Sequence, residues 1–367
     1  MKSLLQVGLI AAAASISSAA LAAPPDYYPS DYNQIVEASK GEKGLLIYSN
    51  FAAVNWDPII KAFNAEYPWI KVTTTDMGAS EVFERYLADV GSNVPSADML
   101  MSGAPLSWMD LLTKDVVQQY QSPETSKVPA WSISAPGVYT VSADPFVIAY
   151  NKLVLPESDW PKTMADILAL VRKDPNHLQH KMGAYAPDAN ALTEAVFWEY
   201  LQHGGGDPLA LLKEIGPQTD IYRSGGPVIE KLTSGEYVAT YLMSAQAVLA
   251  VMADPNRQKL LGWDVPSDAA EVNVRNMAIT KTSASPNSAK LMLDFIMSQK
   301  GQIAVGNGGL IPYRSDVDAS QVATGVTYDT IAKDVGEKNI ILITLDKAMP
   351  DGLKTALPQL LAAFQQQ

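Results

Sequence analysis

The chain has 367 residues, a formal net charge of −12 and no cysteine, which excludes disulfides, thiolate metal sites and cysteine nucleophiles. Its Lys and Arg residues are scattered along an acidic sequence, which argues against nucleic-acid binding, because phosphate contacts need clustered cations. A chain of this length is expected to form two domains rather than one core.

The first 22 residues have the order of a secretory signal peptide. Lys2 provides a basic start, Leu4 to Ala14 is apolar, and small residues lead to an Ala20-Leu21-Ala22 cleavage site. The apolar stretch is shorter than the roughly 20 residues that a bilayer requires. We therefore expect cleavage after Ala22 and an exported protein that is not embedded in a membrane.

Strand and helix patterns alternate after a Pro- and Tyr-rich extension at residues 23–43. The extension itself contains one short predicted helix at Tyr32–Ser39. Apolar and β-branched runs predict strands, and helical spacing of apolar residues predicts helices. In chain order these are a strand at 44–48, a helix at 56–67, a strand at 70–75, a helix at 82–90, a strand at 97–101 and a helix at 105–112. This alternation is typical of a parallel α/β sheet.

The second half of the chain begins with two predicted strands, 138–141 and 146–150, around Asp144-Pro145. We expect the chain to pass there from one lobe into another. The segments that follow are a helix at 163–173, a strand at 182–185, a long helix ending near His203, a helix at 228–234, a strand at 237–242 and a helix at 244–252. A strand at 272–279 is the predicted return crossing, and helices at 287–297 and 353–364 follow it.

Five local motifs resemble those of the type II periplasmic binding proteins, in the branch that contains ferric-ion, phosphosugar, thiamine and phosphonate binders. They are Leu46–Ser49, Ser96–Ser102, Ser224–Glu236, Ser298–Gln302 and Gly309–Pro312. Each motif alone is weak, but together they span about Gly44 to Asp316 in the order of that family.

The resemblance implies an α/β protein of two lobes, with central mixed sheets joined by a two-strand hinge. Lobe 1 would comprise 44–143 with 273–367 returning to it, and lobe 2 would comprise 144–272. It further implies a monomeric periplasmic substrate-binding component of an ABC transporter. Such a protein needs no cofactor and hands a small-molecule solute to a permease.

The ligand is expected between the lobes, because ligands of open α/β sheets bind at the carboxyl ends of strands and at helix N-termini. Hydroxyls and backbone amides there suit an organic anion, such as a phosphonate, phosphate ester or carboxylate, and Arg223 could clamp it with two parallel bonds. The same Ser, Asp and Asn residues could instead be simple helix caps. The predicted ligand-binding residues are Ser49, Asn50, Gly78, Ala79, Ser80, Ser102, Gly103, Asp188, Asn190, Tyr222, Arg223, Ser224, Gly225, Tyr241 and Ser244.

Ferric iron is not the expected ligand. The ferric binders place two adjacent tyrosines where this chain has Leu242-Met243-Ser244-Ala245, and Tyr241 stands alone; hard ferric iron needs such phenolate oxygens. A metal binder without the tyrosine pair remains an alternative. So does a periplasmic hydrolase or a ligand-sensing protein on the same fold, although the sequence has no G-x-S-x-G, Walker or HExxH motif to favour an enzyme.

Overall fold

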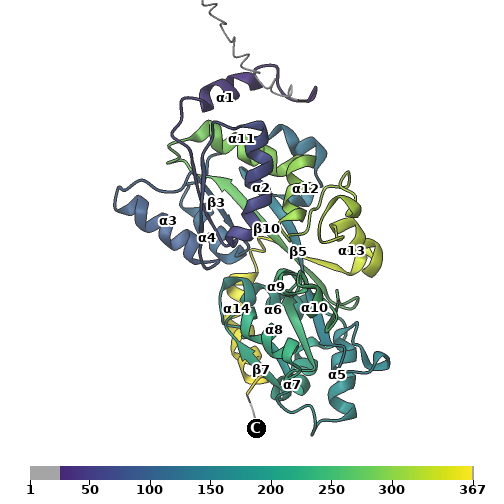
Figure 1. Cartoon of the computed structure of the whole chain (residues 1–367). Helices are drawn as coiled ribbons and strands as arrows, with labels where there is room; N and C mark the ends of the chain where they lie inside the picture. Colours follow the sequence, from purple (N-terminus) through teal and green to yellow (C-terminus); the bar gives the residue numbers. More distant parts are fainter. Residues whose placement is uncertain (1–24, 366–367) are drawn as a thin grey trace, which may run out of the picture.

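The computed structural model describes residues 25–365, so the predicted signal peptide lies outside the described residues. Two lobes are stacked end to end, and the chain passes between them more than once (Figure 1). No helix within residues 25–365 is long and apolar enough to span a bilayer.

Lobe 1 is built on the sheet order β2-β1-β3-β10-β5, in which β1, β2 and β3 are parallel and β10 runs antiparallel to β3 and β5. The predicted mixed sheet is therefore confirmed. Its strands are β1 (Leu45–Ser49), β2 (Val72–Asp76), β3 (Met99–Ser102), β4 (Ile133–Ala135), β5 (Val138–Asn151) and β10 (Ala270–Ile279). Its helices are α1 (Tyr32–Ser39), α2 (Ala53–Glu66), α3 (Glu81–Gly91), α4 (Pro105–Thr113), α11 (Pro286–Met297) and α12 (Gln299–Asn307).

Lobe 2 continues from the other end of β5 with the order β5-β8-β6-β7, in which β6 is parallel to both neighbours. Its strands are β6 (Met182–Tyr185), β7 (Thr219–Tyr222), β8 (Ala239–Ser244) and β9 (Leu261–Asp264). Its helices are α5 (Met164–Lys173), α6 (Ala191–His203), α7 (Pro208–Ile215), α8 (Gly225–Ser234), α9 (Ala245–Met252) and α10 (Pro255–Gln258). The C-terminal part adds α13 (Tyr328–Val335), β11 (Ile340–Ile343) and α14 (Met349–Ala363).

Local sequence explains where these elements begin. α3 buries Val82, Phe83 and Tyr86, an apolar face of helical spacing. α5 starts at a capping box, in which the Thr163 hydroxyl accepts from the Asp166 amide and the Asp166 carboxylate accepts from the Thr163 amide. The strand registers place the carboxyl ends of β1 and β3 in lobe 1, and of β6 and β8 in lobe 2, toward the boundary between the lobes.

The prediction of two separate strands around Pro145 was wrong. β5 is one continuous strand whose first half belongs to lobe 1 and whose second half belongs to lobe 2, and all of it is buried. Pro145 lacks an amide donor, and it sits where β5 passes from one sheet to the other, so the missing ladder bond is tolerated. The sequence around Asp144-Pro145 indicated the crossing correctly but not its continuity.

The final helix belongs to lobe 2, contrary to the predicted return of the whole C-terminal segment to lobe 1. α14 packs on α6 and α7, and Met349, Leu353 and Leu360 are buried in the same cluster as Phe197 of α6. The segment that carries β11 is therefore a third crossing, beside β5 and β10.

Candidate functional site

Arg275 occupies the centre of the boundary between the lobes. It lies on β10, is 2% exposed, and its Nε donates to Asp144 Oδ2 on β5 at 3.0 Å. Its Nη1 donates to Asn50 Oδ1, directly after β1, at 3.0 Å. Its guanidinium carbon lies 5.0 Å from the centroid of the Phe51 ring, a cation–π distance. The buried Arg275 guanidinium thus lies at the edge of the lobe 1 sheet where the carboxyl ends of its parallel strands are found.

Asn273 and Gly103 extend this corner. Asn273 lies two residues before Arg275 on β10, and it is 1% exposed. A Cβ at Gly103 would come within 2.4 Å of Asn273 Nδ2 and 3.4 Å of Arg275 Nη1. Only glycine allows both donors to approach the backbone where β3 leads into α4. We call Asn50, Gly103, Asn273 and Arg275 the hinge corner.

Lobe 2 reaches the same corner through α9. Gln246 Oε1 accepts from Arg275 Nη2 at 3.4 Å, and Gln246 Nε2 donates to Asn55 Oδ1 of α2 at 3.0 Å. A second contact between the lobes joins α4 to α6, where Leu106 packs against the lobe 2 core and Ala191 against the lobe 1 core. The two lobes therefore touch at the hinge corner and where α4 meets α6.

Tyr185, at the end of β6, lies close to two of the predicted lobe 2 residues. Its hydroxyl would lie 2.7 Å from a Cβ at Gly225, the first residue of α8. Burial raises the pKa of this phenol to about 12 and outweighs the backbone of Ser244, which lowers the pKa. Arg275 acts on the same phenol electrostatically, so two predicted residues, Gly225 and Ser244, are connected to the hinge corner through Tyr185.

Most helices that begin at the boundary have no side-chain cap. In five of them, among the residues that the structure describes, no first-turn amide donates to the side chain of the capping residue. Their first residues follow Ala52, Ser80, Ala104, Ser224 and Ser244. α6 is the exception at the boundary, where Asn190 caps it. Away from the boundary, α5 and α7 are capped by Thr163 and Asp207, while α1, α11 and α14 also lack a side-chain cap. Uncapped first turns keep amide donors available to a ligand.

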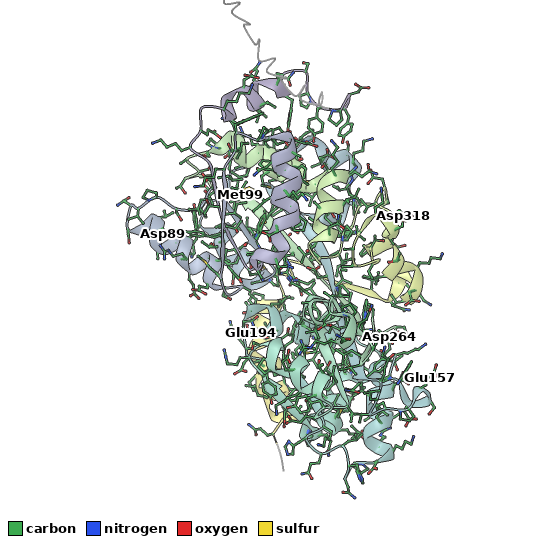
Figure 2. All side chains as sticks on the ribbon, viewed as in Figure 1. Asp89, Met99, Glu157, Glu194, Asp264 and Asp318 are labelled. Atoms are coloured by element: carbon green, nitrogen blue, oxygen red, sulfur yellow. The ribbon has the colours of Figure 1, made fainter. Side chains whose placement is uncertain are left out.

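Two carboxylates mark the opposite side of the boundary. Asp188 precedes α6 and is exposed. Glu194, which is labelled in Figure 2, lies in the first turn of α6. Burial raises the pKa of Glu194, and the Asp188 charge adds to the effect. This corner repels an anion, so negative charge is favoured on the lobe 1 side, next to Arg275.

Three predicted ligand-binding residues instead serve the protein interior. Tyr241 is fully buried in the lobe 2 core, where its hydroxyl pairs with Thr219 at 2.8 Å. Ser49 accepts from Trp56 Nε1 and donates to the Thr75 carbonyl. Ser102 donates to the Ala79 carbonyl at 2.6 Å. Tyr241 faces the core because alternate residues of a strand point to opposite faces.

The other predictions lie at the boundary edges of their own lobes. Arg223 is exposed and donates to the Ala189 carbonyl at 2.6 Å, which keeps it within lobe 2. The Tyr222 hydroxyl pairs with the Tyr237 hydroxyl at 2.8 Å. Asn190 caps α6 with two amide bonds. The remaining positions follow strands or open helices, as expected, and they are Gly78, Ala79, Ser80 and Ser224.

Sequence reasoning missed Arg275, Asn273, Gln246 and Tyr185. A signal was present for the first two, because the predicted return strand contains an arginine and asparagines in an otherwise apolar run. Buried charges in strands are rare unless they are paired or functional. Within residues 25–365 no three His, Cys, Asp or Glu side chains are grouped so as to hold a metal ion.

The sequence matches the model of the bacterial extracellular solute-binding proteins over residues 58–332. The chain belongs to this family. A search of curated proteins gave no significant match.

Solved structures of several binding proteins share the fold. The substrate-binding protein of an ABC transporter from Agrobacterium tumefaciens aligns with a TM-score of 0.76 at 19% identity, covering 89% of this chain and 95% of that one. The apo ferric-ion-binding protein A of Pasteurella haemolytica gives 0.67 at 17% identity, covering 87% and 97%. AfuA of Actinobacillus pleuropneumoniae, solved with fructose-6-phosphate, gives 0.61 at 18% identity, covering 80% and 97%. At these identities the likeness concerns the fold.

Proposed function

We propose that this extracellular solute-binding protein is the periplasmic substrate-binding component of an ABC importer and that it captures a small organic anion between its lobes. The family and the two-lobed fold support the transport role. The predicted signal peptide supports export. Arg275 carries the choice of an anion, because its guanidinium is the buried cation at the boundary and its fork geometry suits carboxylate and phosphate.

The bonds of Arg275 explain how an anion would be held. Asp144 balances its charge through Nε, while Nη1 and Nη2 donate to the neutral amides of Asn50 and Gln246. A carboxylate or phosphate makes stronger bonds with a guanidinium than an amide oxygen does. The ligand would replace one or both amides, and the uncapped start of α4 beside Gly103 would add backbone donors. Closure of the lobes around it would change the shape that a permease senses.

The residues at the ferric-binder position support an organic ligand over iron. Tyr241 is committed to the core, and Tyr185 is the phenol next to Ser244. A single phenol with Ser244 falls short of the oxygen ligands that ferric iron prefers.

The test is a thermal-shift and calorimetric comparison of the protein from residue 23 onward with its Arg275→Met variant. The panel contains phosphate esters, phosphonates, carboxylates, neutral sugars, amines and ferric citrate. A ligand at a hundredfold excess over its Kd stabilises the native state by about 2.7 kcal/mol. We expect one anionic class to do so, unchanged in composition after incubation, and Arg275→Met to weaken its binding at least tenfold.

Arg172→Met is the matched control, because Arg172 forms an exposed ion pair with Glu214 on the outside of lobe 2. It removes the same charge without touching the boundary. Stabilisation by neutral sugars or by ferric iron alone would contradict the proposal, and consumption of the ligand would favour an enzyme.

A further inference from the structure

Asn273 has a buried side-chain amide that no protein group pairs. The residue is 1% exposed, and neither its Oδ1 nor its Nδ2 has a hydrogen-bond partner. Such an amide offers two N–H donors and one carbonyl acceptor. Buried polar groups of native proteins are nearly always satisfied, so an unpaired one at a binding site indicates a missing partner.

Asn276 on the same strand shows the contrast. It is 2% exposed, and its Oδ1 accepts from the Ser134 hydroxyl at 2.7 Å. Asn276 is thus supplied with a partner from β4, whereas Asn273 faces Gly103, which has no side chain to offer. The missing partner of Asn273 therefore has to come from outside the chain.

Asn273 lies next to Arg275, so the group that binds Asn273 belongs to the same ligand as the group that binds Arg275. Asn273 Nδ2 and Arg275 Nη1 both lie within 3.4 Å of the point that a Cβ would occupy at Gly103. A group bound by Asn273 is therefore an immediate neighbour of a group bound by Arg275. A hydroxyl fits Asn273 best, because it donates one hydrogen bond to Oδ1 and accepts another from Nδ2.

We infer that Asn273 is a specificity-determining residue which reads a hydroxyl next to the anionic group, so that the solute is a hydroxylated organic anion such as a sugar phosphate, polyol phosphate or hydroxy acid. This inference rests on the proposed capture of an anion by Arg275. An analogue without the hydroxyl leaves the buried amide unpaired, and sites built to bond a hydroxyl discriminate strongly against such analogues.

The experiment uses pairs of anions that differ in hydroxyl groups alone. Isothermal titration calorimetry would measure glycerol 3-phosphate against propyl phosphate, and malate against succinate, on the protein from residue 23 onward. We expect wild type to bind the hydroxylated member of at least one pair at least tenfold more tightly. Asn273→Leu should reduce that ratio to within about twofold, mainly by weakening the hydroxylated member.

Asn276→Leu is the control for a loss of fold, because it removes an amide of the same size from the same strand. It should keep the wild-type ratio, and thermal unfolding of both variants confirms that they are folded. Equal affinity for both members of each pair would overturn the inference and leave anion capture standing. A ratio that survives Asn273→Leu would also overturn it. If no anion of the thermal-shift panel binds wild type, the proposed function fails and this inference with it.

Discussion

Two buried arginines, one in each of two regions, show how differently a buried cation can be paired. Arg314, at the outer end of lobe 1, is 4% exposed and bonds two carboxylates, Glu124 at 2.6 Å and Asp316 at 2.7 Å. It also donates to the Met297 carbonyl at 3.0 Å. Glu124 in turn accepts from Tyr27 and Tyr28, so Arg314 anchors the N-terminal extension.

Arg275, at the boundary, has one carboxylate and two neutral amides as partners. A guanidinium bonds an ionised carboxylate more strongly than it bonds the neutral oxygen of an amide. An additional anion would therefore stabilise Arg314 little, because two carboxylates already bind it. Arg275 can replace an amide partner by an anionic ligand and form a stronger bond. A buried arginine with neutral partners marks a binding site better than a buried arginine as such.

We expect the largest loss of stability when Arg314 is separated from its two carboxylate partners, Glu124 and Asp316. Arg314→Met leaves Glu124 buried without its cation, which typically costs about 3–5 kcal/mol. Urea unfolding would measure this loss. The double variant Arg314→Met with Glu124→Leu should recover part of it, because replacing both partners by apolar groups is often neutral. A loss below about 1 kcal/mol in the single variant would remove Arg314 as the anchor.

The second prediction concerns the pH dependence of the free energy of unfolding, which involves a carboxyl group in the same region. Burial, with the charge of Glu124, raises the pKa of Asp294 to about 7. Between its ordinary pKa and this value the native state binds a proton that the unfolded state has released. The free energy of unfolding therefore falls as pH rises toward 7.

Asp294→Asn isolates this contribution. Each unit of pKa shift corresponds to about 1.36 kcal/mol, so raising the pH from 5 to 8 should cost wild type about 2–3 kcal/mol more than the variant. Urea unfolding at the two pH values measures the difference. An equal change in both proteins would show that Asp294 is ionised in the native state below pH 7.

Arg275→Met should destabilise the protein less than Arg314→Met does, because Arg275 pairs with one carboxylate and Arg314 with two. Asp144 also keeps two other donors, the Ser142 hydroxyl at 2.7 Å and the Ile311 amide at 3.0 Å. We therefore expect a loss of about 1–3 kcal/mol, the usual cost of a partly unpaired buried group. If urea unfolding showed equal losses for the two arginines, the contrast drawn between them would fail.

The smallest effect concerns the contact between the lobes. Gln246→Leu removes the bonds to Asn55 and Arg275, each worth about 0.5–1.5 kcal/mol. The variant should populate a more open ligand-free state. Small-angle scattering would report a larger radius of gyration than in wild type. An unchanged radius would assign the separation of the lobes to the hinge strands instead.

Much of the fold was predictable from local pattern. The bounds of α1 and β6 agree with the prediction, and the alternation of strands and helices gave both sheets. The continuity of β5 and the docking of α14 were not predictable, because both depend on which distant surface buries the segment. An apolar stripe on a helix predicts that the helix packs against another element, but it does not identify that element.

The candidate site was predictable by position more than by chemistry. Loops after strands could be read from the sequence, and Asn50, Gly103, Gly225 and Ser244 do lie at the boundary. Which strand face turns toward the ligand depends on register, and a bulge between Arg275 and Asn276 shifts it. Arg275 could therefore not be assigned to the site by alternation alone.

The docking of α14 has a consequence for the order in which the chain folds. The core of lobe 2 contains Ile343, Met349, Leu360 and Phe364 together with residues of β5 and α6. These contacts span most of the sequence, and such non-local pairing slows folding. Lobe 2 cannot complete its core until the last residues of the chain are available. A chain that lacks α14 would thus leave the lobe 2 core incomplete and loosely packed.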